Sequence, residues 1–168
     1  KNVLEAYKKL KAEGADKLVL DLRGNGGGLL NEAVNIVNIF VDKGQTVVSK
    51  KAKNVEKSVT FKTTQKAFDA NVPLVVLIDA YSASASEIVA GSLQDLDRAV
   101  VVGQRSFGKG LVQTVIPLIY NTQMKVTESK YYIPSGRCIQ AIDYANRDEN
   151  GRATKIPDSL KTAFKTKN

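Results

Sequence analysis

The segment that decides the fold is residues 17–28, which have the sequence KLVLDLRGNGGG. Residues 17–22 are apolar almost throughout, which is typical of a strand buried in a parallel sheet. Four of the five positions from Gly24 to Gly28 are glycine, and apolar residues at helical spacing follow over 29–41. A buried strand that passes through a glycine-rich turn into a helix predicts the first half of a βαβ unit.

A second strand, turn and helix follow in the same order. We expect a strand over 74–78, then a serine-rich turn over 81–86, then a helix that extends to Leu96, and a third strand over 99–103. This alternation predicts an α/β fold with βαβ units and a mainly parallel sheet. Right-handed crossovers would place both strand-to-helix turns at the carboxyl edge of that sheet, so we expect the two turns to meet in space.

The remaining segments carry antiparallel patterns and a polar C-terminal part. Residues 3–13 predict a helix, and two pairs of segments predict antiparallel β ribbons, namely 46–50 with 58–62 and 111–119 with 124–133. We therefore expect a core domain over residues 1–141. Residues 142–168 are predicted to be a polar extension, irregular over 142–156 and with a short terminal helix over 157–164.

The composition limits the chemistry that the chain can perform. Its 168 residues, 43% of them hydrophobic, are enough for one domain with a buried core. The absence of His excludes Ser-His-Asp and Cys-His catalysis and every His-based metal site. The single Cys138 allows no internal disulfide and no Cys-only zinc site. We expect no metal or organic cofactor, and catalysis would have to use Ser, Lys, Asp, Glu, Tyr or backbone groups.

The net charge of +8 comes from lysines scattered along the chain, which indicates a solvated surface. With no Trp and few aromatic residues, we expect no nucleic-acid partner. The charge is compatible with a weak attraction to acidic membrane surfaces. No apolar stretch approaches the roughly 18–20 residues that cross a bilayer.

Ser84 lies where the second buried strand turns into its helix. The amides at a helix N-terminus face any negative charge that forms beside them, as an acyl-transfer nucleophile requires. The run Ser84-Ala85-Ser86-Glu87 is also a helix capping box, which needs no catalytic role. The local pattern does not rank Ser84 above Ser82 or Ser86.

The glycine cluster and Lys109 are the other candidates for a site. The cluster could supply backbone amides to an oxyanion, whereas its spacing matches neither GxGxxG nor a P-loop. Lys109 lies between two glycines, and without His it could act as a base if burial lowered the pKa of its ammonium. Gln113 would share a strand face with Lys109 if the strand began there, and it could orient the lysine. Alternatively the cluster is a tight turn and Lys109 is a solvated lysine.

Together these segments resemble peptidase family S41, the carboxy-terminal processing (tail-specific) proteases. The matching segments are LVLDLRGNGGG at 18–28, SASASEIVAG at 82–91, VVGQRSFGKGLVQ at 101–113 and YYIPSG at 131–136. The resemblance implies that Ser84 is the nucleophile, Lys109 its base and Gln113 an assisting residue. It also implies an oxyanion hole made by the amides of Ala85 and a glycine of the turn, with Gly28 favoured and Gly27 as the alternative.

The family resemblance implies a ClpP/crotonase-like fold and a serine endopeptidase that trims unfolded or C-terminally exposed proteins through an acyl-enzyme. Relatives commonly carry a PDZ domain ahead of the core, and we expect one in a longer parent protein because the residues before position 15 are too few for it. An exported setting, the periplasm or bacterial cell envelope, is also implied. The alternatives are a non-catalytic peptide- or ligand-binding module of the same fold and a crotonase-like acyl-CoA enzyme.

Overall fold

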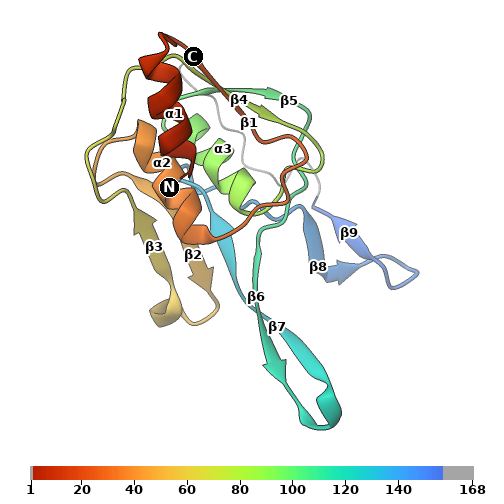
Figure 1. Ribbon diagram of the computed structural model, residues 1–168. Coiled ribbons are helices and arrows are strands. Elements are labelled where there is room, and N and C mark those ends of the chain that lie inside the picture. Colours follow the sequence, from red (N-terminus) through yellow and green to blue (C-terminus); the bar gives the residue numbers. More distant parts are fainter. Residues whose placement is uncertain (1, 157–168) are drawn as a thin grey trace.

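The computed structural model describes residues 2–156, and over these the chain forms the helices and strands shown in Figure 1. In chain order the elements are α1 (Asn2–Ala12), β1 (Leu18–Asp21), α2 (Leu30–Phe40), β2 (Thr46–Ala52), the 3-10 turn η1 (Val55–Lys57), β3 (Val59–Lys62), β4 (Leu74–Ile78), α3 (Ala85–Asp95), β5 (Val100–Gly103), β6 (Leu111–Pro117), the 3-10 turn η2 (Ile119–Asn121), β7 (Gln123–Tyr132), β8 (Ile142–Arg147) and β9 (Ala153–Lys155).

The parallel sheet contains three strands in the order β1-β4-β5. Leu18 pairs with Leu74 and Val75 pairs with Val100, so the central strand β4 lies between its two neighbours in parallel register. The predicted βαβ order is confirmed. All three strands point the same way, so the turns that follow β1 and β4 share one edge of the sheet.

The second sheet is antiparallel and has the order β3-β2-β7-β6. Both predicted ribbons are present, and the pairing of β2 with β7 joins them into one sheet, which the sequence did not indicate. The hairpin formed by β6 and β7 extends well beyond the body of the protein (Figure 1). The segment that carries Lys109 leads directly into this hairpin.

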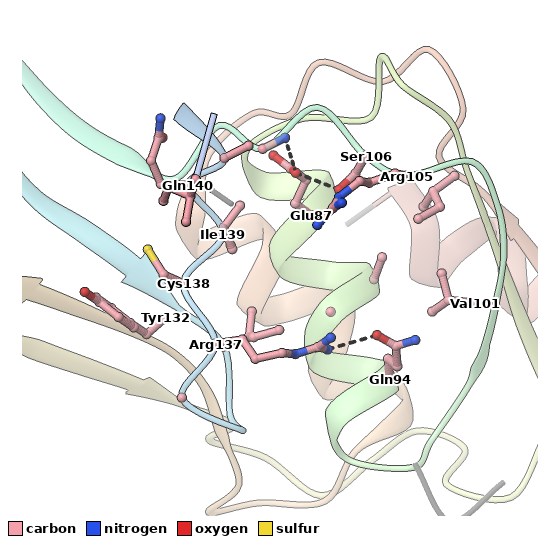
Figure 2. A pocket seen from close by; sticks show the side chains of 18 residues that line it. Glu87, Gln94, Val101, Arg105, Ser106, Tyr132, Arg137, Cys138, Ile139 and Gln140 are labelled. Atoms are coloured by element: carbon pink, nitrogen blue, oxygen red, sulfur yellow. Dashed lines mark hydrogen bonds between the residues drawn. The ribbon is translucent and has the colours of Figure 1, made fainter. Parts of the chain in front are cut away.

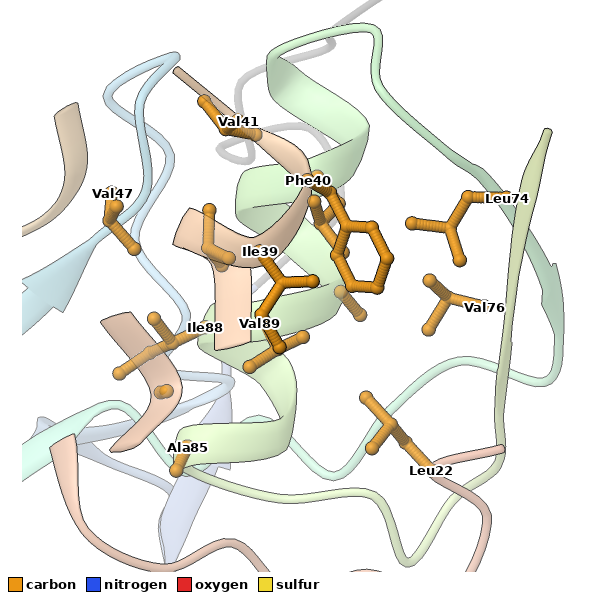
Figure 3. Packing of buried hydrophobic residues seen from close by; sticks show 14 of the residues in the cluster. Leu22, Ile39, Phe40, Val41, Val47, Leu74, Val76, Ala85, Ile88 and Val89 are labelled. Carbon is orange, nitrogen blue, oxygen red and sulfur yellow. The ribbon is translucent and has the colours of Figure 1, made fainter. Parts of the chain in front are cut away.

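The hydrophobic core lies between the two sheets, with helices α2 and α3 in the middle. Figure 3 shows Val47 of β2 on one side of these helices and Leu74 and Val76 of β4 on the other. Phe40 and Leu93 are completely buried in this cluster. The burial of each such side chain contributes about 1.5–3 kcal/mol to folding. The packing of α3 can therefore offset a strained backbone in the loop that precedes this helix.

The prediction that residues 142–156 are irregular was wrong, because they form a two-stranded antiparallel ribbon of β8 and β9. The Asp148 carboxylate closes its turn by accepting the amides of Asn150 and Arg152 at 3.0 and 2.7 Å. The Asn150-Gly151 pair was the hairpin signal. Because polar side chains dominate the ribbon, the alternation that marks a half-buried strand is missing. The helix predicted over 157–164 lies outside the described residues.

No helix within residues 2–156 has the length and apolar character needed to span a bilayer.

Candidate active site

Ser84 has a strained backbone at the N-terminus of α3. Its φ and ψ are 57° and −115°, a region that glycine adopts easily and a residue with a Cβ does not. A conformation of this kind costs on the order of 1–3 kcal/mol and persists only where the surroundings determine it. Ser84 must therefore be held by neighbouring groups, and those groups connect it to two other loops.

The buried carboxylate of Glu87 connects Ser84 to the loop that contains Lys109. Its Oε2 accepts the backbone N–H of Ser84 and that of Lys109, each at 2.8 Å. Its Oε1 accepts the N–H of Gly108 at 2.6 Å and the hydroxyl of Ser106 at 2.7 Å. The Ser84 bond is the one that a capping box predicts, whereas the other three come from a segment about twenty residues away. We call this arrangement the Glu87 clamp.

The Asp79 carboxylate holds the turn after β4 against the glycine-rich turn after β1. Its Oδ1 accepts the N–H groups of Gly24 at 3.0 Å, Tyr81 at 2.9 Å and Ser82 at 3.0 Å. The Gly24 amide is the main reason that the pKa of Asp79 lies below its ordinary value. The prediction that the two turns meet at the carboxyl edge is confirmed.

The other two serines of the run are occupied by structural bonds. Ser82 is completely buried, and its hydroxyl donates to the carbonyl of Leu22 at 2.7 Å. The Ser86 hydroxyl is also buried and donates to the Asn25 side chain at 2.9 Å. Ser84 alone of the three is partly exposed. The structure thus separates Ser84 from Ser82 and Ser86, which the local sequence pattern could not do.

Gly27 lies in direct contact with the Ser84 turn. Its φ is +98°, and a Cβ on it would come within 2.6 Å of the Ala83 carbonyl oxygen and 2.8 Å of the Ala85 nitrogen. Its N–H donates to the Asn25 side chain at 2.9 Å. Only glycine fits here, so the glycine cluster serves the close approach of two backbones as well as the turn itself.

Lys109 is anchored through its backbone, but its side chain is exposed. The two flanking glycines pack tightly, because a Cβ on Gly108 or Gly110 would come within 2.3 Å of residues 140–141. Lys109 lies between these two close contacts and is itself exposed. The burial that was the condition for Lys109 to act as a base is therefore not present in this structure. Within residues 2–156 no hydrogen bond or ion pair involves that ammonium.

Gln113 is not brought to Lys109. Its carboxamide donates to the Thr127 hydroxyl at 3.2 Å, across to β7. A register shift between Val112 and Gln113 interrupts the alternation, and β6 begins only at Leu111. The condition for Lys109 and Gln113 to share a strand face is consequently not met.

A cavity of about 460 Å³ lies behind the Glu87 clamp. Figure 2 shows Glu87 and Ser106 at one end of it and the pair formed by Arg137 and Gln94 at the other. Ala90, Gly91, Val101 and Ile139 are among the residues that form its walls, whereas Ser84 and Lys109 do not line it. Over the described residues, no group of three or more His, Cys, Asp or Glu side chains could hold a metal ion.

Residues 1–146 match the model of peptidase family S41. The chain belongs to this family. It is 42% identical over 140 residues to the carboxy-terminal-processing protease of Bartonella bacilliformis, covering 83% of this chain and 32% of that protein. It is 44% identical over 138 residues to the probable CtpA-like serine protease of Staphylococcus aureus strain N315, covering 82% of this chain and 27% of that protein.

Solved structures of the family have the same architecture. The photosystem II D1 C-terminal processing protease superposes with a TM-score of 0.73 at 37% identity, covering 81% of this chain and 35% of that one. A putative S41 protease from Bacteroides fragilis has a TM-score of 0.65 at 19% identity, covers 80% of this chain and 38% of that one, and supports the fold alone. The ClpP/crotonase-like fold is thereby confirmed. The chain spans about a third of the length of the relatives it matches.

Replacing Gly27 tests the close approach of the two turns. We expect Gly27→Ala to lower the free energy of unfolding by more than about 1 kcal/mol, since it adds both overlap and an unfavourable positive φ. The matched control is Gly26→Ala, where a Cβ meets no atom within 4 Å. That control should change stability by no more than about 0.5 kcal/mol. Urea denaturation measures both, and equal losses would contradict the contact.

Replacing Ser84 tests the strain at the N-terminus of α3. Ser84→Gly should unfold at a higher urea concentration than Ser84→Ala, with a difference of about 1 kcal/mol, because both lose the hydroxyl and only glycine relieves the strain. An alanine variant as stable as the glycine variant would show that the backbone of Ser84 is relaxed.

Proposed function

We propose that this chain is the catalytic core of a serine endopeptidase that processes the C-terminal parts of protein substrates. The observation that carries the proposal is the Glu87 clamp, in which one carboxylate oxygen lies 2.8 Å from the amides of both Ser84 and Lys109. A nucleophile candidate and a base candidate, twenty-five positions apart in the chain, are thus held side by side through their backbones. Membership of family S41 supports the same reading of the site.

In the proposed reaction the neutral amine of Lys109 accepts the proton of the Ser84 hydroxyl. The Ser84 Oγ then forms a bond to the substrate carbonyl carbon, and the peptide C–N bond breaks as the same proton passes to the leaving amine. Water adds to the resulting acyl-enzyme and releases the new C-terminus. The long, flexible stem of the lysine allows its amine to turn toward Ser84 while the Lys109 backbone stays in place.

The amides of Ala85 and Gly28 would stabilise the oxyanion. Ala85 opens α3, where backbone N–H groups face outward from the helix end. Among the described residues neither amide donates to a protein acceptor, whereas the Gly27 amide donates to Asn25. This difference favours Gly28 over Gly27 as the second donor.

The role of Gln113 in this proposal requires its side chain to change partners. To orient Lys109, its carboxamide would have to exchange its bond to Thr127 for one to the lysine amine. As a neutral group it would do so without favouring the protonated lysine.

Apolar side chains around the site support a polypeptide substrate. Leu29, Tyr81 and Phe107 are 75%, 73% and 57% exposed, and they lie on the three loops that meet at Ser84. Exposed apolar side chains on neighbouring loops favour contact with an apolar partner. Unfolded or C-terminally exposed proteins present such side chains on a flexible backbone.

The setting and the wider protein are also part of the proposal. By its resemblance to exported relatives, this chain would act in the periplasm or bacterial cell envelope, at the membrane periphery. A PDZ domain elsewhere in a longer protein would deliver the substrate's C-terminus to the site.

Casein cleavage by the full-length protein tests the assignment of Ser84 and Lys109. We expect Ser84→Ala to reduce kcat by at least about 10⁴-fold and Lys109→Ala by at least about 10²-fold. The rate should rise with pH, because only the neutral lysine can accept the proton. Lys125→Ala, which removes an exposed lysine of β7, should be as active as the parent.

Two results would contradict this function. Full activity of the Ser84→Ala variant would remove the proposed nucleophile. An inert parent that still binds peptides would favour the non-catalytic binding module.

A further inference from the structure

Asn25 connects the glycine-rich turn to both sides of the Ser84 turn. Its side-chain Oδ1 accepts the N–H of Gly27 and the hydroxyl of Ser86, each at 2.9 Å. Its backbone carbonyl accepts the N–H of Ala83 at 3.0 Å. The bonds to Ser86 and Ala83 cross about sixty positions of sequence, and the sequence pattern gave Asn25 no role beyond that of a turn residue.

The Gly27 peptide that Asn25 holds lies against the proposed nucleophile. A Cβ on Gly27 would be 2.9 Å from the Cβ of Ser84 and 2.8 Å from the nitrogen of Ala85. The N–H of Gly27 points to Asn25, and the next amide along the chain is that of Gly28. The orientation of the Gly27 residue therefore determines where the Gly28 N–H points relative to the Ala85 N–H.

We propose that Asn25 is a positioning residue for the oxyanion hole, and this inference rests on the function proposed above. Its carboxamide oxygen holds the Gly27 N–H away from the site, and in doing so it aims the Gly28 N–H at the position where the substrate oxyanion forms. Oxyanion donors act at about 2.7–3.1 Å, so a small rotation of this turn removes most of their effect. Ser86 fixes the same oxygen from the helix side.

The uncharged carboxamide is part of the proposal. A carboxylate at position 25 could still accept the bonds from Gly27 and Ser86, yet it would place a negative charge close to the developing oxyanion. In a site filled by substrate, such a charge would destabilise the negatively charged transition state more than it destabilises the neutral bound substrate. Asn25→Asp therefore keeps both bonds and tests whether the Asn25 side chain lies close to the oxyanion, whereas Ser86→Ala removes one of the bonds that fix that side chain.

The experiment compares Asn25→Asp and Ser86→Ala with the parent, as full-length proteins at equal concentrations of titrated active sites. We measure kcat and KM for one peptide substrate and the Ki of the matching peptide aldehyde, which forms a hemiacetal with the Ser84 Oγ. We expect Asn25→Asp to lower kcat about 100-fold and to weaken aldehyde binding by a similar factor, with KM within about twofold. Ser86→Ala should lower kcat about tenfold and weaken aldehyde binding by a similar factor.

The control for added charge is Asn121→Asp at the tip of the β6–β7 hairpin, which should match the parent. An unchanged kcat in Asn25→Asp, or a loss seen only in KM, would overturn the inference. If Asn25→Asp unfolds, an unchanged kcat and aldehyde Ki in Ser86→Ala overturns it instead. Failure of the proposed function is distinguishable, because hydrolysis would then either survive in Ser84→Ala or be absent from the parent, whatever residue stands at position 25.

Discussion

The Glu87 carboxylate is the group on which the rest of the site depends. A buried carboxylate is costly unless hydrogen bonds replace its hydration, and here three backbone amides and one hydroxyl do so. Moving either the Ser84 turn or the Lys109 loop would leave this charge partly unsatisfied. The clamp thus gives a physical reason why the backbones of the strained Ser84 and of Lys109 stay at a fixed distance from each other.

The clamp works because it is built on a rigid helix. Glu87 lies in the first turn of α3, and the rest of that helix is packed between the two sheets. Asp79 and Asn25 act in the same way at the glycine-rich turn. Their side-chain oxygens accept the backbone N–H groups of Gly24 and Gly27. Three polar side chains in this way fix the positions of loops that lack regular structure, whereas the Lys109 side chain stays exposed.

Most of the fold could be predicted from the sequence, because apolar periodicity records burial, and burial on α2 and α3 follows that periodicity. The edge strands of the parallel sheet differ: the sequence predicted buried strands, whereas Val19 of β1 and Val100 of β5 are more than half exposed. The ribbon of β8 and β9 was missed because its residues are mostly polar and at most half-buried, and such strands leave no apolar periodicity. Glu87 was visible only as a capping residue, since its bonds to residues 106–109 depend on tertiary structure. The exposure of Lys109 and the Gln113 bond to Thr127 depend on glycine packing and a β-bulge, which no spacing rule encodes.

Amide hydrogen exchange in Glu87→Gln tests the clamp most directly. A glutamine keeps the shape of the side chain, but it presents one acceptor oxygen and an NH₂ group that cannot receive the amides. The account predicts faster exchange at Ser84, Gly108 and Lys109 together, with the Gly24 amide, which Asp79 holds, unchanged. Faster exchange at Ser84 alone would show that Glu87 is only a helix cap and would contradict the account.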